Sequence, residues 1–169
     1  MTQDALRAVG GHAQVEQRLA AAGWHLPQVK AQGAYAVAVA RHGVVWTAGQ
    51  LSRTEDGVLT GCAHGEADVP AVRRACEIAV LRAIAAVRTV VDLDAVDQVL
   101  CLRGFVVATP AFQCHSQALD AASDILLHAF GPRAGVHVRS ALGVSSLPSG
   151  GLVELELTVG ISTSAPGPS

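Results

Sequence analysis

The chain is poor in lysine and in aromatic residues. Lys30 is its one lysine, and phenylalanine, tryptophan and tyrosine together make up 4% of its 169 residues. The formal net charge is -2, and the arginines are scattered along the sequence instead of clustered. Nucleic-acid binding needs a basic surface for phosphates, often with aromatic platforms for unstacked bases. We therefore do not favour a nucleic-acid partner.

Several common catalytic and metal-binding motifs are also missing. The sequence has no G-x-S-x-G elbow, no glycine-rich phosphate loop and no H-E-x-x-H pair. Its seven histidines show no tight ligand spacing, and its four cysteines (Cys62, Cys76, Cys101 and Cys114) form no C-x-x-C pair. We expect no metal and no cofactor, and we assign these residues to the core or the surface.

Long apolar runs are absent as well. No stretch reaches the roughly eighteen consecutive apolar residues of a membrane span, and the opening MTQDALRAVGGHAQ is too polar for a secretory leader. We expect a soluble, cytoplasmic protein with reduced thiols and no membrane partner. Half of the residues are hydrophobic, enough to bury the core of one domain. We divide that domain into an N-terminal helix and linker (1–30), a core (33–161) and a flexible tail (162–169).

The hydrophobic pattern predicts an α+β fold, a mixed β-sheet with two long helices packed on one face. A short leading helix ends at Gly23, and a hairpin with a glycine turn and a second turn at Asp56-Gly57 follow it. The expected helices cover 12–22, 69–92 and 114–130, and the expected strands cover 34–40, 44–51, 96–109, 135–144 and 152–161.

Two of these segments carry clear periodicities. In the helix over 69–92 a buried stripe recurs at helical spacing, and Arg73 can pair with Glu77 on the solvent side. The strand over 152–161 alternates strictly, which places Glu154 and Glu156 on the face opposite to its valines and leucines. Helices on one face leave the second face of the sheet without a cover, which favours self-association.

An arginine inside a β-prone run is the first candidate for chemistry. Arg139 begins RSALGVSSLP, residues 139–148, and VELEL follows at 153–157. A guanidinium in such a run is either paired internally, here with Glu154 or Glu156, or available to an anion. Spacing alone favours the internal pair, and the same pattern lets both glutamates and Tyr35 serve only as solvent-facing strand residues.

These residues together resemble a known family. TAGQL at 47–51, Arg139-Ser140, Leu147-Pro148 and Glu154 occur in the order and spacing of the RidA/YjgF family, also called endoribonuclease L-PSP or translation-inhibitor-like. The resemblance runs from about Gly33 to Ile161 and leaves the leading helix outside. The chain departs from the family pattern at Ala34, at Ala48 and in the loop 108–116, which is typical of a less characterised branch.

The resemblance implies a fold, an assembly and an activity. The fold would be chorismate-mutase-like, and the assembly a homotrimer with its sites between subunits. The activity would be hydrolysis of enamine or imine intermediates, such as 2-aminoacrylate, to a 2-keto acid and ammonia. By position, Arg139 and the backbone amide of Ala141 would hold the substrate carboxylate, Glu154 would orient the water, and Tyr35 would line the pocket.

Two other functions remain open from the sequence. A non-catalytic trimer could use the arginine to bind a small carboxylate metabolite or a protein partner, since a binder needs only Arg139. The older family name also implies endoribonuclease or translation-inhibitor activity, which the charge and composition above disfavour. Keeping Arg139 and Glu154 together favours the deaminase.

Overall fold

The chain is built on one mixed sheet, and the computed structural model describes residues 14–162. The strand order is β1-β2-β8-β6-β7, with β3 paired to β8 farther along the same edge. All neighbours are antiparallel except β6 and β7. The strands are β1 (Ala38–Arg41), β2 (Val44–Thr47), β3 (Gln50–Leu51), β4 (Arg53–Thr54), β5 (Gly57–Val58), β6 (Val96–Val107), β7 (Val138–Val144) and β8 (Val153–Ile161).

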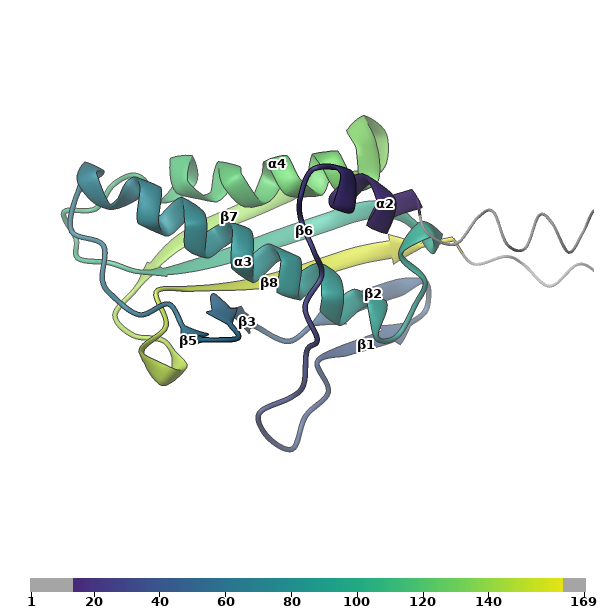
Figure 1. The fold of residues 1–169 in the computed structure, drawn as a ribbon, viewed down its shortest axis with the longest axis horizontal. Coiled ribbons are helices and arrows are strands. Elements are labelled where there is room, and N and C mark those ends of the chain that lie inside the picture. Colours follow the sequence, from purple (N-terminus) through teal and green to yellow (C-terminus); the bar gives the residue numbers. More distant parts are fainter. Residues whose placement is uncertain (1–13, 163–169) are drawn as a thin grey trace, which may run out of the picture.

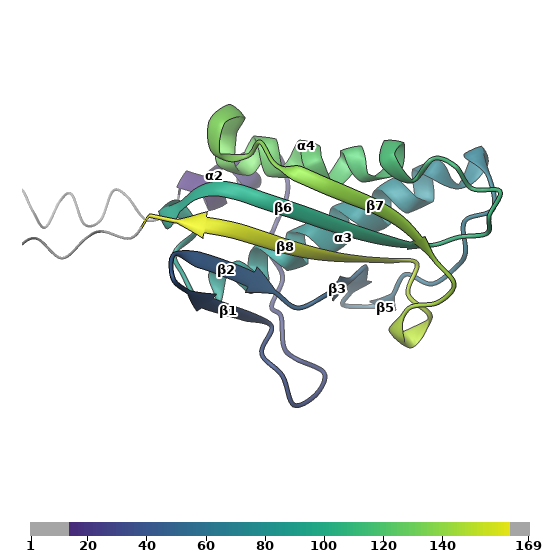
Figure 2. The same cartoon turned by 180° about the vertical axis from the view of Figure 1, so that it is seen from behind.

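Two long helices cover one face of this sheet (Figure 1). Helix α3 packs over β8, β2 and β3, and α4 packs over β6 and β7. Seen from behind, the opposite face carries no helix (Figure 2). This arrangement confirms the predicted α+β architecture. The helices are α2 (Gln14–Ala21), α3 (Val69–Arg88) and α4 (His115–Ala134), with short 3-10 turns at η1 (Glu66–Asp68), η2 (Leu93–Ala95) and η3 (Pro148–Gly150).

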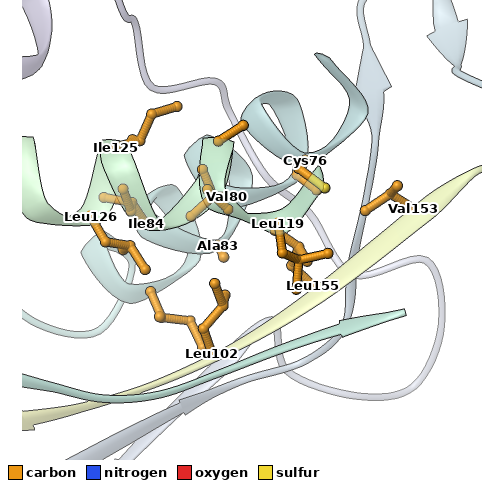
Figure 3. Close-up of a cluster of buried hydrophobic side chains, with 14 of the residues drawn as sticks. Cys76, Val80, Ala83, Ile84, Leu102, Leu119, Ile125, Leu126, Val153 and Leu155 are labelled. Carbon is orange, nitrogen blue, oxygen red and sulfur yellow. The ribbon is translucent and has the colours of Figure 1, made fainter. Parts of the chain in front are cut away.

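The core lies between these helices and the sheet (Figure 3). The stripe predicted for α3 is completely buried, and its two alanines, Ala79 and Ala83, let the helix backbone approach the strands closely. From the other side, β8 contributes Val153, Leu155, Leu157 and Val159, each at most 1% exposed. The predicted alternation of β8 is therefore confirmed: the valines and leucines face the helices, and Glu154 and Glu156 lie on the helix-free face.

The hairpin of β1 and β2 turns at His42 and Gly43, whose φ angles are 50° and 75°. Two successive positive φ angles are the signature of the tight hairpin turns that glycine favours. The predicted strand over 44–51 is interrupted, because β2 ends at Thr47 and β3 begins at Gln50. At the break, Leu157 donates its backbone N–H to Oγ1 of Thr47, at 2.9 Å. Residues 34–37, predicted as strand, precede β1.

Two other local predictions are wrong in detail. Arg73 does not pair with Glu77; Arg74 does, at 3.0 Å, while Arg73 donates to the carbonyl of Gln117 on α4. The three-residue spacing is as good as four on a helix, and only the neighbouring helix decides between the two arginines. Helix α4 also continues past the predicted stop, after a kink at Gly131 with φ 83°.

Helix α2 begins on the carboxylate of Asp94, which accepts from the backbone N–H groups of Gln14 and Val15. Its end follows the prediction, because Gly23 has φ 80° and can terminate the helix in the left-handed region. Residues 12–13 of the predicted helix, and 163–169 of the predicted tail, lie outside the described residues. No helix between residues 14 and 162 has the length and apolarity to cross a membrane.

The close approach of α4 to the sheet depends on Gly104 of β6. A β-carbon added there would overlap the fully buried side chain of Leu119. We expect Gly104→Ala to lower the free energy of unfolding by about 1–3 kcal/mol, the usual cost of overpacking a core. Urea unfolding followed by circular dichroism measures it. Gly65→Ala, at an extended position with open space around it, is the control, and an equal loss there would contradict the argument.

Candidate functional site

Glu154 lines a small hollow beside the break between β2 and β3. On β8 it stands opposite Leu51 of β3 and Phe105 of β6. Its side chain folds over Gly49, because a β-carbon added to this glycine would overlap Oε1 of Glu154. The glycine of TAGQL is therefore required by the place of the carboxylate, which the sequence motif alone could not show.

The surroundings of Glu154 disfavour its charged form. Partial burial raises the pKa of the carboxyl above its ordinary value, and the nearby carboxylate of Glu156 raises it further. Within residues 14–162 no arginine or lysine forms an ion pair with Glu154, whereas Glu156 lies 4.0 Å from Arg103. A carboxylate with a raised pKa is better suited to accept a proton than one in open water.

A cavity of about 130 Å³ brings Glu154 and Tyr35 together. Its walls come from the segment before β1, from the β2–β3 break, and from the η3 turn at Pro148 and Ser149. Tyr35 is 55% exposed, and its hydroxyl accepts from the backbone N–H of Gln32 at 3.4 Å. Two of the four residues predicted for the site thus meet in a single chain.

Arg139 lies elsewhere in the chain, on the helix side of β7. It is paired with Leu102 of β6, which points into the core, so its guanidinium meets α4. There it forms an ion pair of 2.7 Å with Asp120 and donates to Ser116 and Ser123. The predicted internal pairing exists, but its predicted partners Glu154 and Glu156 were wrong, because β8 directs both to the opposite face.

Ala141 shares this side of β7 and stands opposite Gly104. The carbonyl of Val144 accepts from Ala108 and therefore points toward β6. Backbone groups alternate along a parallel ladder, so the N–H of Ala141 points away from β6, to the open edge of the sheet. Neither Arg139 nor Ala141 lines the cavity of Glu154 within one chain.

Three cations at the cavity wall were not predicted: Lys30, Arg53 and Arg82. They come from the segment before β1, from β4 and from the last turns of α3, and nothing in their sequence spacing connects them. None of the three belongs to a recognisable sequence motif, so no signal in the sequence pointed to them. Among residues 14–162, no three side chains of the metal-binding types gather into a site.

Comparison with known proteins identifies the family and supports the fold. Residues 16–158 match the model of the family described as "YjgF/chorismate mutase-like, putative endoribonuclease". The chain belongs to this family, and its fold is the chorismate-mutase-like one. The matched range begins inside α2, so the similarity extends further toward the N-terminus than Gly33, where the resemblance in sequence starts.

Individual relatives are similar over most of the chain. Protein TCP17 of Trypanosoma cruzi is 36% identical over 118 residues, which are 66% of this chain and 71% of that protein. The structure of Atu1372 from Agrobacterium tumefaciens, of unknown function, has a TM-score of 0.81 at 27% identity and covers 94% of this chain and 99% of its own. A "putative endoribonuclease" from Shewanella oneidensis has a TM-score of 0.80 at 30% identity, covering 88% and 99%.

The raised pKa of Glu154 has a consequence for stability. The folded protein holds a proton on this carboxyl at pH values where the unfolded chain has lost it, so stability falls as pH rises through the raised pKa. We expect Glu154→Gln to melt at a higher temperature than the wild type at pH 7, and the difference to shrink toward pH 4. Differential scanning fluorimetry measures both.

Glu66→Gln, an exposed substitution at η1, is the control for this comparison. It should change the melting temperature equally at the two pH values. A Glu154→Gln variant that melts below the wild type at pH 7 would mean that the carboxylate stabilises the fold.

Proposed function

We propose that the protein hydrolyses 2-imino acids and their enamine tautomers, of the 2-aminoacrylate class, to 2-keto acids and ammonia. The observation that carries this proposal is the half-buried Glu154, with its raised pKa, beside Tyr35 in a small cavity. Membership in the YjgF family is compatible with this activity.

The chemistry requires little from the protein. An imine carbon is already electrophilic, so the site must hold it, place a water and help ammonia leave. Glu154 accepts a proton from the water as the water oxygen bonds to the carbon of the protonated imine, and the C=N electron pair moves to the nitrogen to give an amine. Glu154 then returns the proton to that nitrogen. As the C–N bond breaks and ammonia leaves, the hydroxyl loses its proton to Glu154, which passes it to solvent, and the C=O bond of the keto acid forms. No metal or cofactor is part of this scheme.

Arg139 is the proposed ligand of the substrate carboxylate, together with the backbone N–H of Ala141. In one chain both lie on β7, away from Glu154, and β7 is an edge strand. The site is therefore completed when β7 of one subunit approaches the Glu154 cavity of another. Asp120 holds the free guanidinium in place, and its carboxylate is the group with which the substrate carboxylate competes.

We propose a homotrimer as the assembly that completes the site. The helix-free face offers an apolar row for it, because the register aligns Val39, Trp46, Thr158, Cys101 and Val138 across five strands. Trp46 is 44% exposed and Val138 70% exposed. Apolar side chains gathered on one open sheet face are typical of a contact surface between proteins.

The non-catalytic alternative also has an observation in its favour. Arg139 already has four hydrogen bonds to α4, so a chain could keep it for structure or for ligand binding without turnover. Glu154 distinguishes the two functions, because only hydrolysis needs it.

The activity is tested with imines that an amino-acid oxidase generates in the reaction mixture; semicarbazide traps the imine that remains. The wild type should accelerate loss of the trapped imine. Glu154→Gln should lower kcat by about 10²- to 10⁴-fold, the usual effect of removing a general base. Arg139→Ala should raise KM by about 10-fold or more, because it removes a charge-assisted contact with the carboxylate.

Glu66→Gln is again the matched control and should retain the wild-type rate. No acceleration by the wild type with any small or large imine would refute the deaminase. A Glu154→Gln variant with full activity would leave hydrolysis but remove Glu154 from it.

The assembly is tested by sedimentation equilibrium. The wild type should sediment as a trimer, and Trp46→Glu should dissociate it, because a charge at the centre of an apolar interface is costly to bury. Val90→Lys, at an exposed apolar residue outside this face, should remain trimeric. A monomeric wild type would overturn the assembly.

A further inference from the structure

A second and larger cavity adjoins the Glu154 site. It measures about 490 Å³ and lies between α3, β4 and the segment that leads from α2 to β1. The two cavities share four residues of their walls: Lys30, Gln32, Arg53 and Arg82. A molecule in the larger cavity can therefore extend past this shared wall toward Glu154.

The shared wall is cationic, and its charges are unpaired among the described residues. Within residues 14–162 neither Lys30, Arg53 nor Arg82 takes part in an ion pair or a side-chain hydrogen bond. The walls contain only two acids, Glu55 in the larger cavity and Glu154 in the smaller, and neither is paired with these cations. Other arginines of α3, such as Arg74 and Arg88, do have carboxylate partners.

Arg82 is the most constrained member of this group. Its Nε is buried and has no hydrogen-bond partner. Burial lowers the pKa of its guanidinium, and the nearby Arg53 lowers it further. A buried donor without an acceptor, next to a like charge, costs stability. An anion at the shared wall would offset both costs, since a guanidinium offers several donors in one plane.

We propose that Lys30, Arg53 and Arg82 form a binding site for the anionic group, carboxylate or phosphate, of a small organic acid that occupies the larger cavity. The volume suits a small molecule and not a polymer. The substrate class that this site selects rests on the proposed function. The preferred imines are those of acidic amino acids, with the distal carboxylate on Arg82 and the imine carbon near Glu154.

Binding without turnover is the first test. Isothermal titration measures succinate, inorganic phosphate and neutral succinamide at constant ionic strength, on wild type, Arg82→Gln, Arg53→Gln and the control Arg74→Gln. We expect succinate or phosphate to bind wild type and the control, about 10-fold or more weaker binding to the two cavity variants, and no binding of succinamide. Arg53→Gln keeps the test valid if Arg82→Gln fails to fold.

Three results would overturn the site. The first is no binding of either anion to wild type. The second is binding to Arg82→Gln and Arg53→Gln that is as tight as binding to wild type. The third is displacement of succinate by a single-stranded oligoribonucleotide that binds more tightly in an Arg82-dependent way, which would make the wall an RNA contact. Preference for phosphate over succinate, or the reverse, identifies the anionic group and supports the site.

Kinetics separate this inference from the proposed function. Arg82→Gln should raise KM about 10-fold more for the imine of glutamate than for the imine of leucine. If no imine is hydrolysed while anion binding still depends on Arg82, the deaminase fails and the site stands. If imines are hydrolysed and Arg82→Gln changes nothing, the site fails and the deaminase stands.

Discussion

The register of β8 is the constraint on which the rest of the structure depends. Its four inward side chains are at most 1% exposed, so a shift of the register by one residue would expose them to solvent and bury two glutamates. Strands β2, β3 and β6 all pair with β8, and each of them inherits this register. The core therefore fixes where Glu154 stands, and Gly49 provides the space that its carboxylate takes.

Periodicity predicted most of the fold because burial imposes it. The stripe of α3 and the alternation of β8 are both present in the sequence and both found in the core. The contacts at the edges of elements were harder to predict. Arg74 and not Arg73 pairs with Glu77, and the strand over 44–51 breaks where Thr47 accepts a hydrogen bond from β8. Such choices depend on the neighbouring element, which a local pattern does not contain.

The candidate site was predicted only in part, for a related reason. Glu154 and Tyr35 could be predicted because they lie in or near motifs whose spacing is informative. Arg139 lies on the predicted strand, but its ion-pair partner was not predicted, because its side of β7 faces α4 and Asp120. Arg53 and Arg82 belong to a hairpin and a helix 29 positions apart by their numbers. Only the packing of α3 against β4 makes them neighbours.

The region around Glu154 and the shared wall holds two charged groups in unfavourable surroundings. One carboxyl has its pKa raised by burial, and on the shared wall one guanidinium has its pKa lowered by the same cause. The two groups have opposite charges, yet they form no ion pair with each other. If stability alone governed this region, pairing them would be the simplest improvement. Both groups line the smaller cavity without pairing, which leaves room there for a molecule that meets both, with an anionic end at Arg82 and a reactive carbon at Glu154.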